Sequence, residues 1–193
     1  MDPALALQAQ LARARIYAAE KRFAAAAPLF AAVEKSAIEP LASEAVYDRI
    51  EAGLAAGKIK PDAAIDALEA LRFRWRGDSL EMKTLRKLAA LYFAKGSWRD
   101  GLRTLNVAAK DFAGSDAARA AQDEMRAAFV NLYLKGAADK MAPVESLSLF
   151  YEFIDLTPIG PDGDEMIRHM TDRLAALDLL GPAGDLLAYQ VDN

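Results

Sequence analysis

The chain of 193 residues is long enough for one or two domains with a sizeable core. Its net charge of -4 argues against nucleic-acid binding, which needs an excess of positive charge. The absence of cysteine excludes disulfides, thiol nucleophiles and cysteine-ligated zinc. No apolar run approaches the roughly 18 residues of a membrane-spanning helix. The opening residues, MDPALALQAQ, lack the charge pattern and apolar stretch of a secretory signal.

Alanine-rich amphipathic segments separated by proline and glycine predict an all-α protein. The spacing of apolar residues predicts about ten helices in five pairs, and the short loops between them make neighbouring helices antiparallel. The expected pairs are 4–20 with 23–36, 41–56 with 61–76, 78–95 with 98–112, 115–135 with 143–156, and 162–180 with 182–191.

Residues at the expected helix starts support these boundaries. Asp78 and Glu81 have the three-residue spacing of a capping box. In this motif the side chain of each residue accepts a hydrogen bond from the backbone N–H of the other. Pro61 and Pro143 suit a first helical turn, where the missing N–H is not needed. Ser115 or Asp116 is expected to cap the helix that begins there.

One pattern of large and small residues occurs at least twice with identical spacing. The two sets are Tyr17, Phe23, Ala26 and Phe30, and Tyr92, Trp98, Gly101 and Leu105. We expect the tyrosine near the end of each first helix to pack on the aromatic residue that opens the second. The small residue then lets the two helices touch, and the last large residue fills the seam between them.

The segments ARIYAAEKRFAAAAPLF and LAALYFAKGSWRDGLRTL resemble the tetratricopeptide repeat (TPR) signature, which places small and aromatic residues at these offsets over about 34 residues. A middle segment, YDRIEAGLAAGKIKPDAAIDALEAL, matches less well because Ala55 replaces the tyrosine. The resemblance implies one right-handed superhelical solenoid over residues 1–193, with the first helix of each pair lining a concave groove.

Two further segments, LRFRWRGDSLE and FYEFIDLTPIGPDGDEMIRHMTDRLAALDLL, are similar to parts of long alphaproteobacterial TPR proteins of poorly defined role. The last residues, AYQVDN, do not form the polar capping helix that a solenoid normally needs. We therefore expect this chain to be a fragment of a longer repeat protein.

The expected groove positions carry an arginine in each of four consecutive pairs. The predicted partner-binding residues are Arg15, Arg49, Lys83, Arg86, Phe93 and Arg126, accompanied by Gln8, Leu11, Val46, Gly53, Ala90 and Asn131. Guanidinium groups spaced along a groove suit the carboxylates of an acidic segment. The alternative is that these arginines are ordinary surface residues paired with nearby Glu or Asp. We expect Glu44, Asp48 and Glu51 to be solvated on helix faces.

The segment RFRWRGDS alternates arginines with Phe73 and Trp75, a pattern that can stack on and neutralise a nucleic acid. We favour a structural interpretation, because positive charge suits a helix C-terminus and the aromatic rings can pack on the next pair.

The acidic segment DLTPIGPDGDE lacks the ligand spacing of a calcium loop. A turn and a helix start explain it without a metal. The single histidine, His169, lies on a helix where Met166, Met170, Leu174 and Leu177 repeat at core spacing.

The sequence thus predicts a non-enzymatic scaffold that binds a protein or peptide, without cofactor, metal, nucleic acid or membrane insertion. A structural spacer or self-association segment within a larger repeat protein is the alternative. An enzyme using His169 with nearby carboxylates is the third and least favoured hypothesis. A cytoplasmic location fits the sequence, and so does a periplasmic one if a longer parent chain carries a signal.

Overall fold

A computed structural model describes residues 2–36 and 38–192, and no strand occurs among them. The chain divides into two compact units, Met1–Phe112 (unit 1) and Ala113–Asn193 (unit 2). Both units are built of α-helices, and in unit 1 these form pairs joined by short loops, which confirms the predicted all-α architecture.

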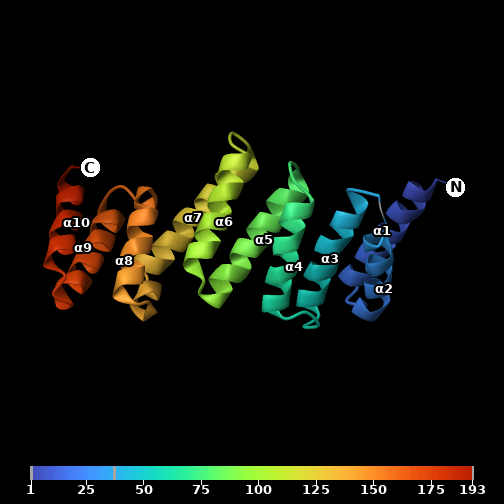
Figure 1. Ribbon diagram of the computed structural model, residues 1–193, viewed down its shortest axis with the longest axis horizontal. Helices are drawn as coiled ribbons and strands as arrows, with labels where there is room; N and C mark the ends of the chain where they lie inside the picture. Colours follow the sequence, from blue (N-terminus) through green and yellow to red (C-terminus); the bar gives the residue numbers. More distant parts are fainter. Residues whose placement is uncertain (1, 37, 193) are drawn as a thin grey trace. The chain divides into compact units, whose positions relative to one another are not determined.

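Unit 1 contains three helix pairs whose bounds lie close to the predicted ones. The helices are α1 (Pro3–Ala19), α2 (Phe23–Glu34), α3 (Leu41–Ala55), α4 (Pro61–Arg74), α5 (Ser79–Lys95) and α6 (Trp98–Asp111). Figure 1 shows them following one another in chain order, from blue to yellow-green.

Side-chain caps fix several of these helix ends. Asp78 accepts hydrogen bonds from the N–H groups of Leu80 at 2.8 Å and Glu81 at 3.4 Å at the start of α5. Glu81 in turn accepts a hydrogen bond from the N–H of Gly77 at 2.5 Å. The predicted capping box is therefore present, except that Glu81 binds the N–H of the residue before Asp78 instead of that of Asp78 itself. Gly96 ends α5 with a φ of 82°, a left-handed conformation that favours glycine.

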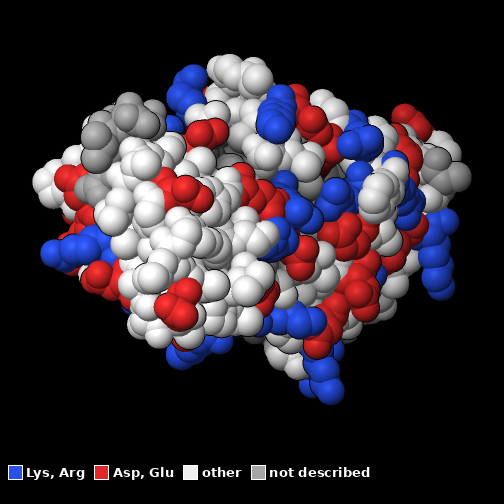
Figure 2. Space-filling model, turned by 60° about the vertical axis from the view of Figure 1, so that its left-hand side comes forward, with Lys and Arg blue, Asp and Glu red and all other residues white. Residues whose placement is uncertain are grey.

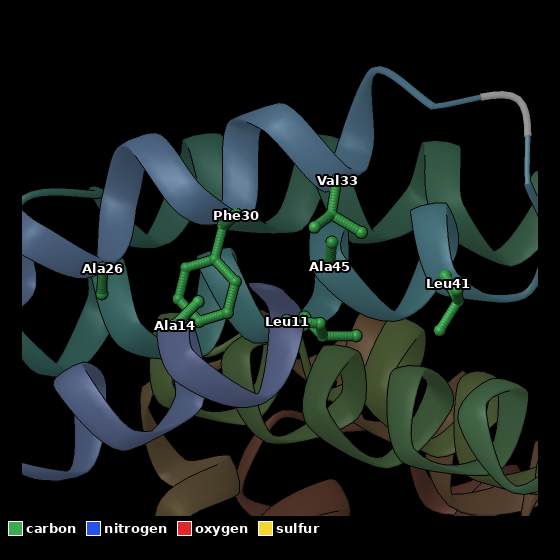
Figure 3. Packing of buried hydrophobic residues seen from close by; sticks show 7 residues of the cluster. All are labelled: Leu11, Ala14, Ala26, Phe30, Val33, Leu41 and Ala45. Carbon is green, nitrogen blue, oxygen red and sulfur yellow. The ribbon is translucent and has the colours of Figure 1, made fainter. Parts of the chain in front are cut away.

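Large side chains of α2 form the core between the first pair and α3. The Phe30 ring and Val33, both at most 1% exposed, belong to one cluster with Leu11 and Ala14 of α1 and Ala45 of α3. Figure 3 shows the Phe30 ring directed from α2 toward Ala14, with Val33 beside Ala45. This confirms the predicted role of Phe30 as the filler of its seam.

The third pair shows why a small residue is needed in the seam. A Cβ placed on Gly101 of α6 would lie 2.3 Å from the Phe93 ring of α5. The Phe93 ring also lies against Trp98, with centroids 5.5 Å apart, so the aromatic partner of Trp98 is Phe93 rather than Tyr92 as expected. Tyr92 packs on the core between α3, α4 and α5 and donates a hydrogen bond to Glu69 of α4 at 2.9 Å.

Unit 2 comprises α7 (Asp116–Tyr133), α8 (Pro143–Glu152), α9 (Pro161–Ala176) and α10 (Leu180–Asp192), with 3₁₀ turns η1 (Ala137–Lys140) and η2 (Ile154–Leu156). Its core holds three aromatic rings, Phe129, Tyr133 and Phe150, with centroids 4.7 to 5.4 Å apart. The Tyr133 hydroxyl donates a hydrogen bond to the carbonyl of Ser146 at 2.8 Å, which satisfies the one polar group of the cluster. The predicted helix 143–156 ends earlier, at Glu152, and the chain continues into η2.

Substituting Gly101→Ala is expected to lower the free energy of unfolding by about 1–3 kcal/mol, because the new methyl group overpacks the seam against Phe93. Gly184→Ala in α10 is the matched control, since a Cβ there has nothing within 4 Å and alanine is the better helix former. Urea unfolding followed by circular dichroism measures both. Equal stability of Gly101→Ala and the parent protein would show that the seam opens without cost.

Candidate partner-binding face

The first helices of the three pairs in unit 1 share one surface, the first-helix face. It contains a hollow of about 290 Å³ lined by residues of all three helices. The lining residues are Arg15 of α1, Glu44, Tyr47 and Asp48 of α3, and Asp78, Ser79, Leu80 and Lys83 at the start of α5. Of the predicted partner-binding residues, Arg15 and Lys83 line this hollow.

Arg15 joins α1 to α3 through two carboxylates. Its Nη2 atom lies 2.6 Å from Glu44 Oε2, and its Nε atom lies 2.6 Å from Asp48 Oδ2. Burial lowers the pKa of Arg15, but the hydrogen bonds to these two carboxylates outweigh burial and raise it. The guanidinium group is thus already occupied by partners from the same chain, as the more conservative sequence interpretation anticipated.

Asp48 and Tyr47 form the half-buried floor of this face. Burial raises the pKa of the Asp48 carboxyl above its usual value, with Arg15 opposing the shift. Burial, followed by the negative charges of Glu51 and Asp48, raises the pKa of the Tyr47 hydroxyl to about 12. The phenol is therefore harder to ionise than a tyrosine in water.

Cations of α5 complete the face. Lys87 Nζ lies 2.6 Å from Glu51 Oε1, which joins α5 to α3. Lys83 is exposed at the hollow and has no ion pair or side-chain hydrogen bond among residues 2–36 and 38–192, although its charge acts on Asp48 at longer range. Arg86 is also exposed, and its charge partly offsets the raised pKa of Tyr47. On the side of the molecule seen in Figure 2, basic and acidic side chains lie next to one another.

Other predicted site residues lie elsewhere. Arg49 binds Glu34 of α2, with 2.8 Å between Nε and Oε2, and so faces the second helix of the preceding pair. Phe93 lies in the α5–α6 seam. Arg126 lies on α7 of unit 2, exposed and 3.2 Å from Asp123 of the same helix.

Two accompanying predictions were wrong because of burial. Leu11 and Val46 are 1% and 8% exposed and belong to the core rather than to a groove. Successive helical residues differ by about 100° in direction, so a small error in the assumed register moves a side chain from the surface to the core.

The acidic side of the site was missed from the sequence. Glu44 and Asp48 were expected to be solvated, yet the Asp48 side chain is only 22% exposed and both bind Arg15. The steps of four and three residues from Glu44 to Asp48 to Glu51 place the three carboxylates on one side of α3. That spacing was the feature of the sequence that could have predicted an acidic surface on α3.

The segment RFRWRGDS lies at the end of α4, with Arg72 and Arg74 in the last helical turn, as the structural interpretation predicted. Its three arginines pair with carboxylates of the same unit, as Arg72 with Glu69, Arg74 with Glu39, and Arg76 with Glu81. Trp75 donates its indole N–H to Asp78 at 2.8 Å. Phe73 is 73% exposed, so the expectation that both rings pack on the next pair was wrong for this residue.

His169 lies on α9, one helical turn after Glu165. Its Nε2 atom lies 3.5 Å from Glu165 Oε1, and both side chains are about half exposed. Met166, Met170 and Leu174 are buried as predicted, whereas Leu177 is 46% exposed. Within the described parts of the chain, no three His, Cys, Asp or Glu residues are grouped as a metal would require, and no helix is long and apolar enough to cross a membrane.

Comparison with solved structures identifies the fold. A crystal structure of a single-substitution variant of a candidate kinesin light chain from Podosopora anserina, described as having nearly identical TPR-like repeats, superposes with a TM-score of 0.54 at 18% identity. The match covers 98% of this chain and 94% of that one. A second structure of the same protein gives a TM-score of 0.53, also at 18% identity, over 97% and 94% of the two chains. No protein-family model matches the sequence, and neither does any curated protein.

Alkaline pH is expected to destabilise unit 1 through Tyr47. The pKa of its hydroxyl is about 12 in the folded protein against an ordinary value of 10.0, so an unfolded chain releases this proton first. The contribution of Tyr47 to stability is therefore fully present below pH 10 and is lost as the pH rises toward 12. Urea unfolding across this range should show a shallower loss for Tyr47→Phe than for the parent protein, whereas parallel curves would contradict a buried phenol.

Proposed function

The chain has the TPR-like helical-repeat fold, and from that fold we propose that it is a non-enzymatic interaction scaffold. In this proposal the first-helix face of unit 1 binds a segment of a partner protein. The hollow of about 290 Å³ lined by α1, α3 and α5 is the observation that carries the proposal. Depressions lined by a few convergent polar groups are common binding sites.

The charges around the hollow favour an acidic residue in the bound segment. At Lys83 an incoming carboxylate meets an ammonium group that no carboxylate of residues 2–36 and 38–192 neutralises by an ion pair. At Arg15 the same carboxylate competes with Glu44 and Asp48. Lys83 is therefore the primary anchor of the proposed site. Arg15 contributes by binding Glu44 and Asp48, neither of which forms an ion pair with Lys83.

A second candidate function is self-association through unit 2. Several large apolar side chains of this unit are exposed, including Leu180 at 63% and Leu187 at 46% on α10. Apolar side chains that gather on one surface often mark a protein contact. This surface suits either a further copy of the chain or neighbouring repeats of a longer array.

Selection from a displayed library of random peptides tests the first candidate, because such a library samples segments of every charge. We expect the parent protein to enrich peptides with Asp or Glu, and Lys83→Glu to weaken their binding about tenfold or more, because it replaces attraction by repulsion. Lys110→Glu on α6 makes the same change of charge outside the hollow and should leave affinity unchanged. Peptides bound equally by all three proteins would place the contact elsewhere.

Sedimentation velocity over a range of concentrations tests the second candidate. If unit 2 mediates self-association, the parent protein should shift to larger species as concentration rises, and Leu180→Lys with Leu187→Lys should abolish the shift. Leu5→Lys on α1, where the side chain is 59% exposed, is the control for an added charge at an exposed leucine. A parent protein that stays monomeric at all concentrations would exclude this function.

A further inference from the structure

A second cavity of unit 1 lies outside the first-helix face, between α2, α3 and the loop that follows α3. Its volume is about 290 Å³, at the lower end of the roughly 300–1,000 Å³ of small-molecule sites. The walls are almost wholly apolar and consist of Phe23, Ala24, Ala26, Ala27 and Phe30 from α2, and Ala52, Gly53, Ala56 and Ile59 from α3 and its loop. Arg49 and Lys58 are the two charged residues of the lining.

The next contact of the same kind, between α4 and α5, shows what is missing here. Ala26, Phe30 and Val33 of α2 are buried at the same spacing as Ala64, Leu68 and Leu71 of α4. This correspondence pairs Ala27 with Ile65 and Ala24 with Asp62. Ile65 is 7% exposed and packs in a cluster with Leu88 of α5, whereas Ala27 leaves the equivalent space open to the cavity.

The two contacts also differ in their ion pairs. Asp62 Oδ1 lies 2.6 Å from Nζ of Lys95, the last residue of α5. Lys58, just beyond the end of α3, faces a helix that carries Ala24 instead of an aspartate. Its side chain has no ion pair or hydrogen bond among the residues that the structure describes, whereas Arg49 is already held by Glu34. The α2–α3 contact therefore lacks one apolar side chain and one carboxylate that the α4–α5 contact possesses.

We infer that this cavity binds a small organic acid, whose apolar body fills the space beside Phe23 and Phe30 and whose carboxylate pairs with Lys58. The ligand supplies both groups that the α2–α3 contact lacks. An uncharged apolar molecule would pack against the apolar walls but leave Lys58 without a carboxylate. A polar anion would pair with Lys58 but leave the apolar space unfilled. Charge complementarity with apolar confinement selects the amphipathic carboxylate.

Decanoate and decanol form a matched pair of probes that differ in the carboxylate. Isothermal titration calorimetry below the micellar concentration should show saturable binding of decanoate to the parent protein, about tenfold tighter than that of decanol. In NMR spectra the amide signals of Ala52, Gly53 and Ile59 should move on addition of decanoate, because these residues line the cavity.

Two variants import the residues of α4 and are expected to fold, since each side chain already serves the corresponding contact. Ala27→Ile should weaken both probes about tenfold by filling the cavity, and Ala24→Asp should weaken decanoate alone by neutralising Lys58. Ala32→Ile and Ala32→Asp are the controls, because Ala32 is an exposed residue of α2 outside the lining. Absent saturable binding, equal affinity for the two probes, or affinities unchanged by Ala27→Ile and Ala24→Asp would each overturn the inference.

Discussion

The close approach of the two helices within a pair is the constraint on which the rest of unit 1 depends. At the third pair only a hydrogen atom fits where Gly101 meets the Phe93 ring, and Ala26 is almost fully buried beside Phe30 in the first pair. Small residues at the seam bring the helix axes together, so the large side chains on either side interdigitate at the density of a protein interior. Each hairpin is then a defined block, and stacking three blocks places α1, α3 and α5 on one surface.

Ion pairs organise that surface more than they stabilise it. Arg15 is about half exposed, and pairs at such positions contribute at most about 1 kcal/mol. Their effect is to hold Glu44 and Asp48 of α3 beside the guanidinium group of α1. On a mixed surface of this kind the positions of the charges matter as well as the net charge, because like charges that meet across an interface repel each other.

Differences between repeats are as informative as the repeat itself. The α4–α5 contact is filled by Ile65 and closed by the Asp62–Lys95 pair, whereas alanine occupies both equivalent positions on α2. A solenoid tolerates such a local change because each repeat contacts only its neighbours. The fold is retained while one inter-repeat contact contains a cavity.

The sequence by itself determined the helices, their pairing and the small seam residues Ala26 and Gly101, because these follow from local propensity, caps and the 3.6-residue period. Tertiary structure decided which side of a helix becomes a site. Asp48 and Arg49 are adjacent in sequence, yet Asp48 binds α1 and Arg49 binds α2. Tyr92 and Phe93 diverge likewise, one toward Glu69 of α4 and the other toward Trp98 of α6. A rotation of about 100° per residue separates such neighbours, and only the packing of the surrounding helices sets what each direction meets.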